Sequence, residues 1–495
     1  MKLELDHPIT DPELPSYQHP ALREIAADLQ RAYDVFHCLR GEGVKQKYLP
    51  QEPAEPPDAY KARLGRSVFS DFFRASIHAF AGVLSKFSLV DPPASLEAAA
   101  DNIDLEGNSL AAWLQQADSL MLRDGAVALC VEMPPDRPGT AAEEAAMGRR
   151  PYLLHRPRAK ALNWRVSVTD GVETLERVTL LETVEEEDGA FGVKTEPRYR
   201  VIGRGEWWLF KIERDAKNNL TAVQVDQGEY IGANGQRLPV VPVVWYSGDQ
   251  VGFGHGEMEL QQVVEHSIDH FQQRSDLREK THKCAMPVPV AIGRTPPAPG
   301  QAQRPLVIGP NTVIDLDQGG SFTFAEPSAS SLVEQRNQIA EVERLIGRQT
   351  LGFLFGDPGG TKTAKQASME GAQTENAIAR IAQRKASAVQ SLMAIWVMFT
   401  GEPLQPGAGL QMSDTIYEQP LEAADISQLQ QLTAGEKLMS RRSAIEELQR
   451  SGRLKVTTSV EEELERIAEE EPESADDVGL NDFGELPPVE GQPET

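Results

Sequence analysis

A glycine-rich loop ahead of a long helical pattern is the first place where nucleotide chemistry could occur. Residues 356–363 read GDPGGTKT, with the glycines and the Lys-Thr pair of a phosphate-binding loop. Such a loop needs glycine directly before the lysine, so that its backbone amides converge on phosphate, and Thr361 stands there instead. A helical pattern rather than a strand also precedes it. We therefore expect no nucleotide cofactor, and a nucleotide-dependent nucleic-acid enzyme is kept only as the alternative function.

Two histidines at helical spacing are the candidates for metal chemistry. His266 and His270 lie four residues apart beside Glu265 and Asp269, so both could ligate a metal from one face of a helix. The sequence fixes no third ligand, and we expect solvated polar positions beside an apolar stripe. The chain also contains no Gly-x-Ser-x-Gly elbow and no supported Cys/His pair. We expect no catalytic residue, no metal and no enzyme activity.

Basic side chains gather around one predicted helix and the segment that follows it. Their functional interpretation is contact with DNA or with an acidic partner, and the alternative is a solvated face. The residues are Arg274, Arg278, Lys280, Lys283, Arg294 and Arg304.

The longest helical pattern, residues 363–400, organises the second half of the chain. Apolar residues recur every three or four positions, on a stripe that also includes Lys385. Its C-terminal half is apolar on nearly every side, so we expect that half to be buried. Before it, residues 351–361 form an apolar, glycine-rich break, and residues 331–348 are predicted to form another helix.

A small β module is predicted between two helices. A glycine hinge at 248–256 precedes a helix over 257–283, and short β-like runs follow at 288–292 and 313–316 around a proline-rich excursion. The helix predicted over 331–348 would then lead the chain back from the module. Two helices that lead out to a module and back would form a stalk.

The first half of the chain changes from helical to strand periodicity. Residues 1–20 are predicted to be an irregular arm, helices are predicted at 21–39, 59–87 (one or two) and 109–123, and a strand at 126–133. Between 152 and 246 the period of two predicts an antiparallel meander with strands at 175–185, 199–213, 220–230 and 238–246. Trp207 and Trp208 within it could be core residues or an interface.

Composition limits the class of protein. Of the formal charge of −26, residues 455–495 carry −12, and we expect the tail beyond Glu471 to be disordered. The remaining acidic balance is unlike a protein that grips DNA through phosphate neutralisation. Three separated cysteines fit a reducing cytosol, and we expect no membrane segment.

The order of these parts resembles a portal protein of tailed bacteriophages, over about residues 20–471. The N-terminal block YLP (48–50), YKARL (60–64) and SVF (67–69) is similar to one portal-like family. SIDHF (267–271) followed by PVPVAIG (287–293) resembles the helix that enters the clip of those proteins. Thr363-Ala364 opening a long helix, SAIEEL (443–448) and EEELER (461–466) resemble the C-terminal part.

The resemblance implies an α+β, portal-type fold. It would have a long looped helix pair, a helical stem, a small β-containing clip and an antiparallel β-rich wing. The implied boundaries are an arm at 1–20, a wing at 21–250, stem helices at 251–283 and 331–347, a clip at 284–330, a tunnel loop at 348–362, a long wing helix at 363–402, a helical crown region at 403–471 and an acidic tail at 472–495.

The resemblance also implies function and partners. The protein would form a ring, usually of twelve subunits, at one capsid vertex in the virion after assembly in the host cytoplasm. Double-stranded DNA would pass through without sequence specificity, during packaging and again during ejection. The implied partners are the terminase large subunit, a head-tail adaptor, and the major capsid and scaffold proteins. The expected channel residues are Arg348, Leu351, Phe353, Phe355, Asp357 and Lys362. The alternative remains a nucleotide-dependent packaging or nucleic-acid enzyme that uses residues 356–363.

Overall fold

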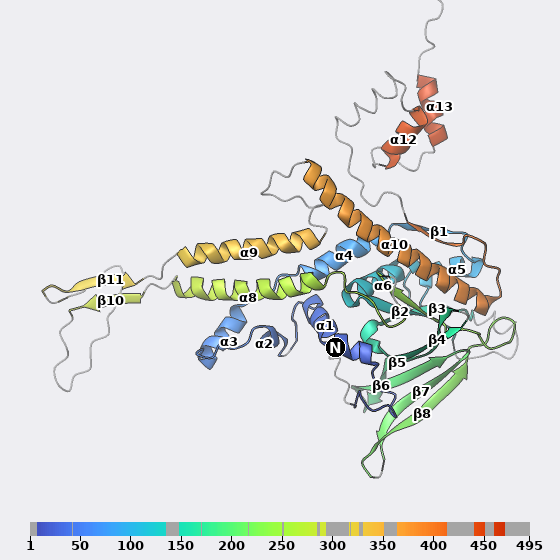
Figure 1. Ribbon diagram of the computed structural model, residues 1–495, viewed down its shortest axis with the longest axis horizontal. Helices are drawn as coiled ribbons and strands as arrows, with labels where there is room; N and C mark the ends of the chain where they lie inside the picture. The colour runs from blue at the N-terminus through green and yellow to red at the C-terminus, as the bar shows by residue number, and fades with distance from the viewer. Residues whose placement is uncertain are drawn as a thin grey trace, which may run out of the picture. The chain divides into compact units, whose positions relative to one another are not determined.

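The computed structural model combines helices with antiparallel sheets, so the predicted α+β class is confirmed (Figure 1). The chain divides into two compact units, Met1–Ser413 and Asp414–Thr495, and each is described by itself. The structure describes residues 7–41, 43–134, 148–169, 171–215, 217–249, 252–284, 288–293, 316, 318–325, 330–350, 364–412, 440–450 and 460–470.

The elements of the first unit follow the predicted change from helices to strands and back to helices. The described helices are α1 (Pro20–Phe36), α2 (Val44–Tyr48), α3 (Pro57–Arg66), α4 (Phe73–Leu84), α5 (Ala94–Ala99), α6 (Leu110–Asp124), α8 (Gln261–Cys284), α9 (Ser330–Gln349) and α10 (Ala364–Thr400). The described strands are β1 (Phe87–Val90), β2 (Ala126–Glu132), β3 (Tyr152–Pro157), β4 (Ala161–Thr169), β5 (Val172–Asp188), β6 (Gly192–Gly203), β7 (Glu206–Arg214), β8 (Leu220–Glu229), β9 (Val243–Ser247), β10 (Val288–Ile292), β11 (Ser321–Ala325) and β12 (Gly409–Met412).

A five-stranded antiparallel sheet contains most of the predicted meander. Its strand order, β4-β5-β6-β7-β8, follows the sequence, as local hairpin connections require. The predicted strand at 199–213 is instead two strands, because Gly205 turns the chain at φ +70°. Side chains alternate between faces, so even-numbered residues of β5 such as Val178 and Leu180 are buried in the core.

The last predicted strand of the meander joins a different sheet. β9 pairs with β2, and the order of this second sheet is β3-β2-β9. β2 reads AVALCVE and is buried along its whole length, so its backbone needs a neighbour on both edges. The prediction of one continuous meander over 152–246 was wrong here, because this pairing spans more than a hundred residues.

The N-terminal arm is irregular, as predicted, but it is attached to the five-stranded sheet. Within the described residues 7–19, the His19 amide donates to the Leu162 carbonyl at 2.8 Å, and the His19 ring stacks on Trp164 at 4.0 Å between centroids. His7 Nδ1 lies 2.8 Å from the Tyr199 hydroxyl. Tyr199 lies opposite Leu181, so this part of the arm covers the face formed by the odd-numbered residues of β5, whereas Trp164 lies opposite Val178 on the other face.

Helix α10 confirms the longest predicted helix and its buried C-terminal half. Ile378, Val389 and Trp396 are almost inaccessible to solvent. Lys385 was predicted on the apolar stripe, and its Nζ instead lies 2.7 Å from Asp118 Oδ2 of α6. The stripe is therefore a packing face with one buried ion pair in it.

A strand, β12, follows α10, where the sequence indicated only helices. β12 pairs antiparallel with β1, so residues 409–412 belong to the first unit and not to a helical region at 403–471. The second unit has the described helices α12 (Arg441–Arg450) and α13 (Val460–Glu470), which an ion pair between Arg442 and Glu461 joins at 2.8 Å.

Gly125 is the glycine whose replacement we expect to matter most for the fold. It ends α6 in the left-handed region at φ +80°, and a Cβ there would lie 2.9 Å from the backbone carbonyl carbon and oxygen of Glu257. We expect Gly125→Ala to lower the free energy of unfolding by more than about 1 kcal/mol, measured by denaturant titration. Gly82→Ala in α4 is the control, since nothing outside the nearby backbone of its own helix lies within 4 Å of its Cβ position, and it should stabilise the protein by about 0.5–1 kcal/mol. Equal effects of both changes would contradict this explanation.

Candidate functional site

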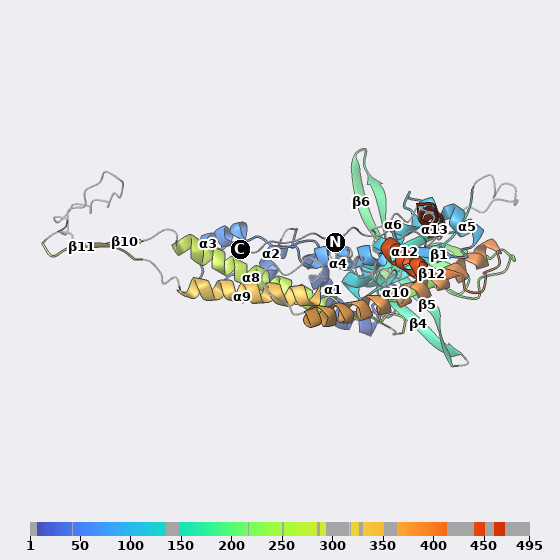
Figure 2. The same cartoon turned by 90° about the horizontal axis from the view of Figure 1, so that it is seen from above.

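Helices α8 and α9 run side by side as an antiparallel pair (Figures 1 and 2). Between them in sequence lies an antiparallel ladder of two strands, β10 and β11, with Val288 opposite Ala325. The predicted arrangement of helix, inserted β module and returning helix is confirmed. The strand predicted at 313–316 lies outside the described residues except for Leu316, and the partner of β10 is β11.

The seam between the two helices explains why this sequence folds back on itself. On α8 the buried positions recur every three or four residues, and α9 offers a matching stripe. The α8 residues are Val263, Val264, Ser267, His270, Phe271 and Ser275, and the α9 residues are Ile339, Val342 and Ile346.

His270 lies inside this seam, which corrects the expectation of a solvated position. Its side chain is fully buried, its Nε2 lies 3.0 Å from Glu343 Oε1 of α9, and its ring meets Phe72 edge-on at 4.9 Å. His266 is half-buried. Across the described ranges, no group of three or more His, Cys, Asp or Glu side chains is placed to hold a metal ion.

The N-terminal helices fasten α8 to the body of the first unit. Gln272 Nε2 donates to the Tyr48 carbonyl of α2 at 2.9 Å, and the hydroxyls of Ser275 and Ser67 lie 2.8 Å apart in a buried contact. Arg31 of α1 pairs with Glu265 at 3.0 Å. These contacts cover the middle and the base of α8, so the helix pair projects from a rigid support.

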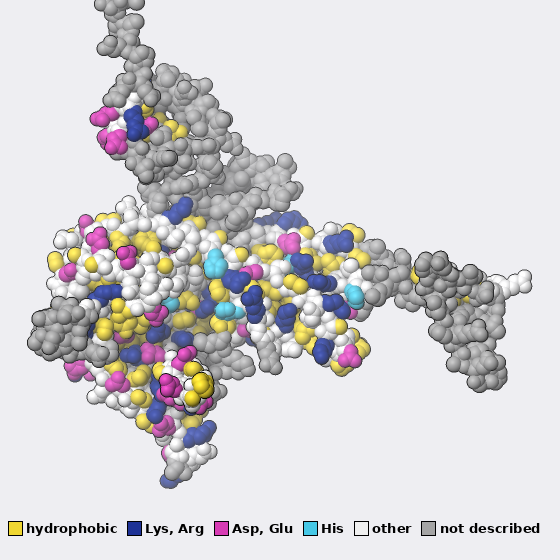
Figure 3. All heavy atoms as spheres, turned by 180° about the vertical axis from the view of Figure 1, so that it is seen from behind, with side chains coloured by type: hydrophobic (Ala, Val, Ile, Leu, Met, Phe, Trp, Pro, Cys, Tyr) yellow, Lys and Arg dark blue, Asp and Glu magenta, His cyan; other side chains and the backbone are white. Residues whose placement is uncertain are grey.

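Three of the predicted basic contacts are described, and all three are exposed. Arg274, Arg278 and Lys280 lie on the outer half of α8, and none of them forms an ion pair with another described residue. Lys and Arg side chains gather over this part of the molecule in Figure 3. The side chain of Lys283, and the whole of Arg294 and Arg304, lie outside the described residues.

The predicted tunnel loop is described only at its start. Arg348 is exposed in the last turn of α9, so it belongs to the helix and not to the loop. The remaining predicted channel residues, and the glycine-rich loop at 356–363, lie outside the described residues, as does the tail beyond Glu471. These residues are Leu351, Phe353, Phe355, Asp357 and Lys362.

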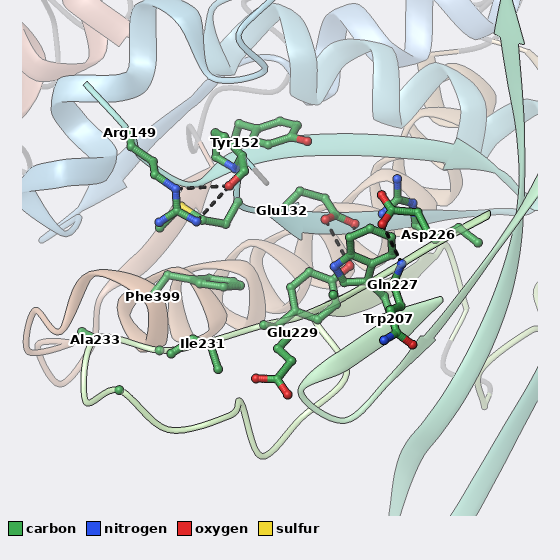
Figure 4. Close-up of a pocket in the computed structure, with 17 residues that line it drawn as sticks. Glu132, Arg149, Tyr152, Trp207, Asp226, Gln227, Glu229, Ile231, Ala233 and Phe399 are labelled. Atoms are coloured by element: carbon green, nitrogen blue, oxygen red, sulfur yellow. Dashed lines mark hydrogen bonds between the residues drawn. The ribbon is translucent and has the colours of Figure 1, made fainter. Parts of the chain in front are cut away.

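A polar cavity of about 500 Å³ lies between the two sheets and the end of α10 (Figure 4). Glu132 at the end of β2 faces Tyr230, whose hydroxyl donates to both carboxylate oxygens at 3.0 and 3.1 Å. Trp207 lines the same cavity, and Arg200 lies over its ring at 4.6 Å. This site could not be predicted from the sequence, since Glu132 is one acidic residue at the end of an apolar strand.

Burial dominates the electrostatics of this cavity. It raises the pKa of Glu132 to about 7, against the opposing effects of Arg200 and of the Tyr230 hydrogen bond. Burial together with Glu132 also raises the pKa of Tyr152, to about 12. A carboxyl group of this kind can exchange a proton near neutral pH, but Tyr230 already satisfies it, and Arg200 is paired with Glu182 at 2.9 Å. The cavity therefore combines the Glu132 carboxyl group, which titrates near neutral pH, with hydrogen bonds and an ion pair that are already formed within the protein.

The sequence profile of a family described as "Domain of unknown function (DUF4055)" matches residues 259–400, less than a third of the chain, from just before α8 to the end of α10. No curated protein matches. None of the described helices is long and apolar enough to cross a lipid bilayer.

Solved structures of low similarity also match. A chain of "Virion of native gene transfer agent (GTA) particle" is 12% identical, with a TM-score of 0.41, over 80% of this chain and 94% of that one. A chain of "Neck of empty GTA particle computed with C6 symmetry" is 14% identical, with a TM-score of 0.39, over 77% of this chain and 90% of that one. A chain of "Neck of native GTA particle computed with C12 symmetry" is 13% identical, with a TM-score of 0.38, over 80% of this chain and 94% of that one.

Proposed function

We propose that this protein is a portal: a ring of about twelve subunits at one capsid vertex, through which double-stranded DNA is packaged and ejected. It has no catalytic role of its own and docks a terminase large subunit and then a head-tail adaptor. One observation carries the proposal: the antiparallel α8–α9 pair leads from the body to a small β module and back.

The contacts of the helix pair are suited to such a stem. α8 is held from Glu265 to Ser275 by α1, α2 and the α3–α4 connection, while Arg274, Arg278 and Lys280 remain exposed on its outer half. A few basic side chains attract the DNA backbone or an acidic partner without the dense phosphate contacts that would hold DNA in place. A supported stem with a sparse basic surface would let DNA slide.

Ring formation is the first expected result. Native mass spectrometry of the purified chain, with and without scaffold or capsid protein, should show one closed oligomer of about twelve copies. The same sample should not hydrolyse ATP, whereas the alternative enzyme would. Monomers alone at micromolar concentration in both conditions, or ATPase activity that Lys362→Ala abolishes, would contradict the portal proposal.

The tunnel loop that the sequence predicts at 348–362 is proposed to line the narrowest part of the channel. Its apolar residues have no helical stripe to join, and they are acceptable where copies crowd around an axis. We expect Phe353→Ser with Phe355→Ser to leave ring formation intact and to reduce the packaging or retention of DNA, measured as the length of genome protected from nuclease. Arg344→Ala, at an exposed position of α9, is the control, and this variant should package DNA normally. If the double variant packaged and retained full-length DNA, Phe353 and Phe355 would not line the channel.

A further inference from the structure

Strand β5 is longer than both of its neighbours in the sheet and forms a free ribbon with β6. β5 pairs with β6 as far as Asp188 opposite Gly192, whereas β4 stops pairing at Leu180 and β7 pairs only with residues 199–202 of β6. Residues 182–188 and 192–198, with the turn between them, are therefore a two-stranded projection, called the ribbon below. Figure 2 shows it, labelled at β6, reaching away from α8 and α9.

One face of the ribbon is apolar and acidic. Phe191 in the turn is fully exposed, at 102%, and Val193 is 67% exposed. Glu185 and Glu187 lie on the same face as Val193, since Glu187 is directly opposite Val193 in the ladder. Neither glutamate forms an ion pair with a described residue. The opposite face is different, because there Arg198 pairs with Glu186 and Glu196 at 2.6 and 2.8 Å.

A fully exposed phenylalanine on a projecting ribbon is costly unless something covers it. An aromatic side chain can remove about 150–250 Å² from water when it is buried, and exposed apolar ribbons promote association. The two unpaired acidic side chains beside it indicate the chemistry of the surface that covers it: an apolar groove with a basic rim.

The same chain carries such a groove, on the outer face of the five-stranded sheet. It has a volume of about 380 Å³ and lies between the N-terminal arm and strands β4 to β8. Half-buried Trp208 and Phe210 form its floor, and Pro15 and Tyr17 of the arm form one wall. Trp208 is thus separate from Trp207, which faces the cavity on the other side of the sheet.

The rim of the groove carries a pair of like charges. Arg177 lines the groove and lies directly opposite Arg165 in the β4–β5 ladder, where two positive side chains repel each other. Arg165 also pairs with Glu176 at 3.1 Å, but Arg177 has no acidic partner within ion-pair distance among the described residues. Glu13, also exposed there, offsets one positive charge. An added carboxylate at Arg177 would relieve the repulsion.

The ribbon cannot fill the groove of its own molecule. The β5–β6 ladder continues without a register shift from Arg177 to Asp188, and eleven residues at about 3.4 Å each place the turn that holds Phe191 about 37 Å from the groove's rim. The groove and the ribbon are therefore two different, complementary surfaces of one chain. Two such surfaces form a head-to-tail contact, which closes into a ring when the rotation between copies allows it.

We propose that the ribbon of one copy inserts Phe191 into the groove of a second copy, with Glu185 and Glu187 facing the second copy's Arg177. This contact rests on the ring proposed above and identifies where neighbouring subunits meet. It also assigns a role to Trp208, which the sequence left between core and interface.

The direct test replaces Phe191 by photo-reactive benzoyl-phenylalanine in the full chain, mixed with isotopically labelled chain of wild-type sequence. After illumination, mass spectrometry should find crosslinks between the two chains that join residue 191 to the peptides containing Tyr17 or Trp208. Crosslinks confined to one chain, to other peptides of the second chain, or to none at all would overturn the proposal.

Variants measure the strength of the contact. Phe191→Ala should weaken association about 30-fold or more, as for a central aromatic anchor, without changing the thermal unfolding of the subunit. Lys194→Ala, on the opposite face of the ribbon, is the control and should associate normally. Arg177→Glu and Glu187→Arg should each weaken association, and their combination should restore it in part. Unchanged association of Phe191→Ala would overturn the proposal.

The outcomes separate this contact from the portal proposal. If the wild-type chain forms closed rings and Phe191→Ala forms them equally well, the ring stands and the ribbon contact is wrong. If residue 191 crosslinks to the groove but only dimers or open chains are found, the contact stands and the portal proposal fails. A chain that stays monomeric at every concentration contradicts both.

Discussion

Replacing Lys385 by alanine should lower the free energy of unfolding by about 3–5 kcal/mol. The Lys385 and Asp118 side chains are 1% and 0% exposed, with Nζ 2.7 Å from Asp118 Oδ2 and 2.7 Å from the Leu84 carbonyl. Burial raises the pKa of Asp118 although Lys385 and Tyr246 oppose it, so the carboxylate is already costly to bury. Without the ammonium group, only the Tyr246 hydroxyl, at 2.9 Å, would remain to stabilise its charge.

Two further variants separate the charge from the packing. Arg380→Ala is the matched control on the same helix, because its pair with Glu259 is half-exposed and should contribute no more than about 1 kcal/mol. Asp118→Asn with Lys385→Met keeps an acceptor for Tyr246 and removes both charges, so it should recover most of the lost stability. Chemical denaturation measures all of them. A loss below about 1 kcal/mol for Lys385→Ala would show that the pair is not buried in solution.

The stability of the protein should fall as the pH rises from about 4.5 to about 7, because of Glu132. Burial raises the pKa of its carboxyl from 4.5 to about 7 in the folded state. Between these values the folded chain binds more protons than the unfolded chain, so raising the pH favours unfolding. The difference of about 2.5 in pKa corresponds to about 3 kcal/mol of folding stability. This contribution is present in full below pH 4.5 and is lost above pH 7.

Denaturant unfolding of the wild-type chain and of Glu132→Gln, each at pH 5 and pH 8, isolates this contribution. Glutamine keeps an oxygen that can accept the Tyr230 hydrogen bond but cannot ionise. The variant should therefore be more stable than the wild type at pH 8 by about 3 kcal/mol and should differ little from it at pH 5. Parallel pH profiles for the two proteins would show that Glu132 is not buried as described.

The sequence predicted the elements that depend on local periodicity. Helices α8, α9 and α10 and strand β10 lie where the apolar spacing indicated, since each buries a stripe that repeats within its own segment. The turn at Asp188-Gly189 was also predictable, because an Asp-Gly pair between two strand patterns is typical of a hairpin turn. Gly189 adopts φ +73° there.

Long-range pairing could not be predicted in the same way. Nothing near β9 marks β2 as its partner, and nothing in α10 marks Lys385 as the partner of Asp118, 267 residues away. His270 looked like a polar position beside a stripe until Phe72 and Glu343 were placed around it. The ribbon face and its groove depend on register, which a short strand pattern does not fix.

Electron microscopy of the purified full-length protein tests the central claim most directly. The proposal predicts closed rings with a central hole, in which three-dimensional averages place the α8–α9 pairs around the axis and the β10–β11 modules at one end. Particles without rotational symmetry, or rings whose α8–α9 pairs point outward from the axis, would contradict it.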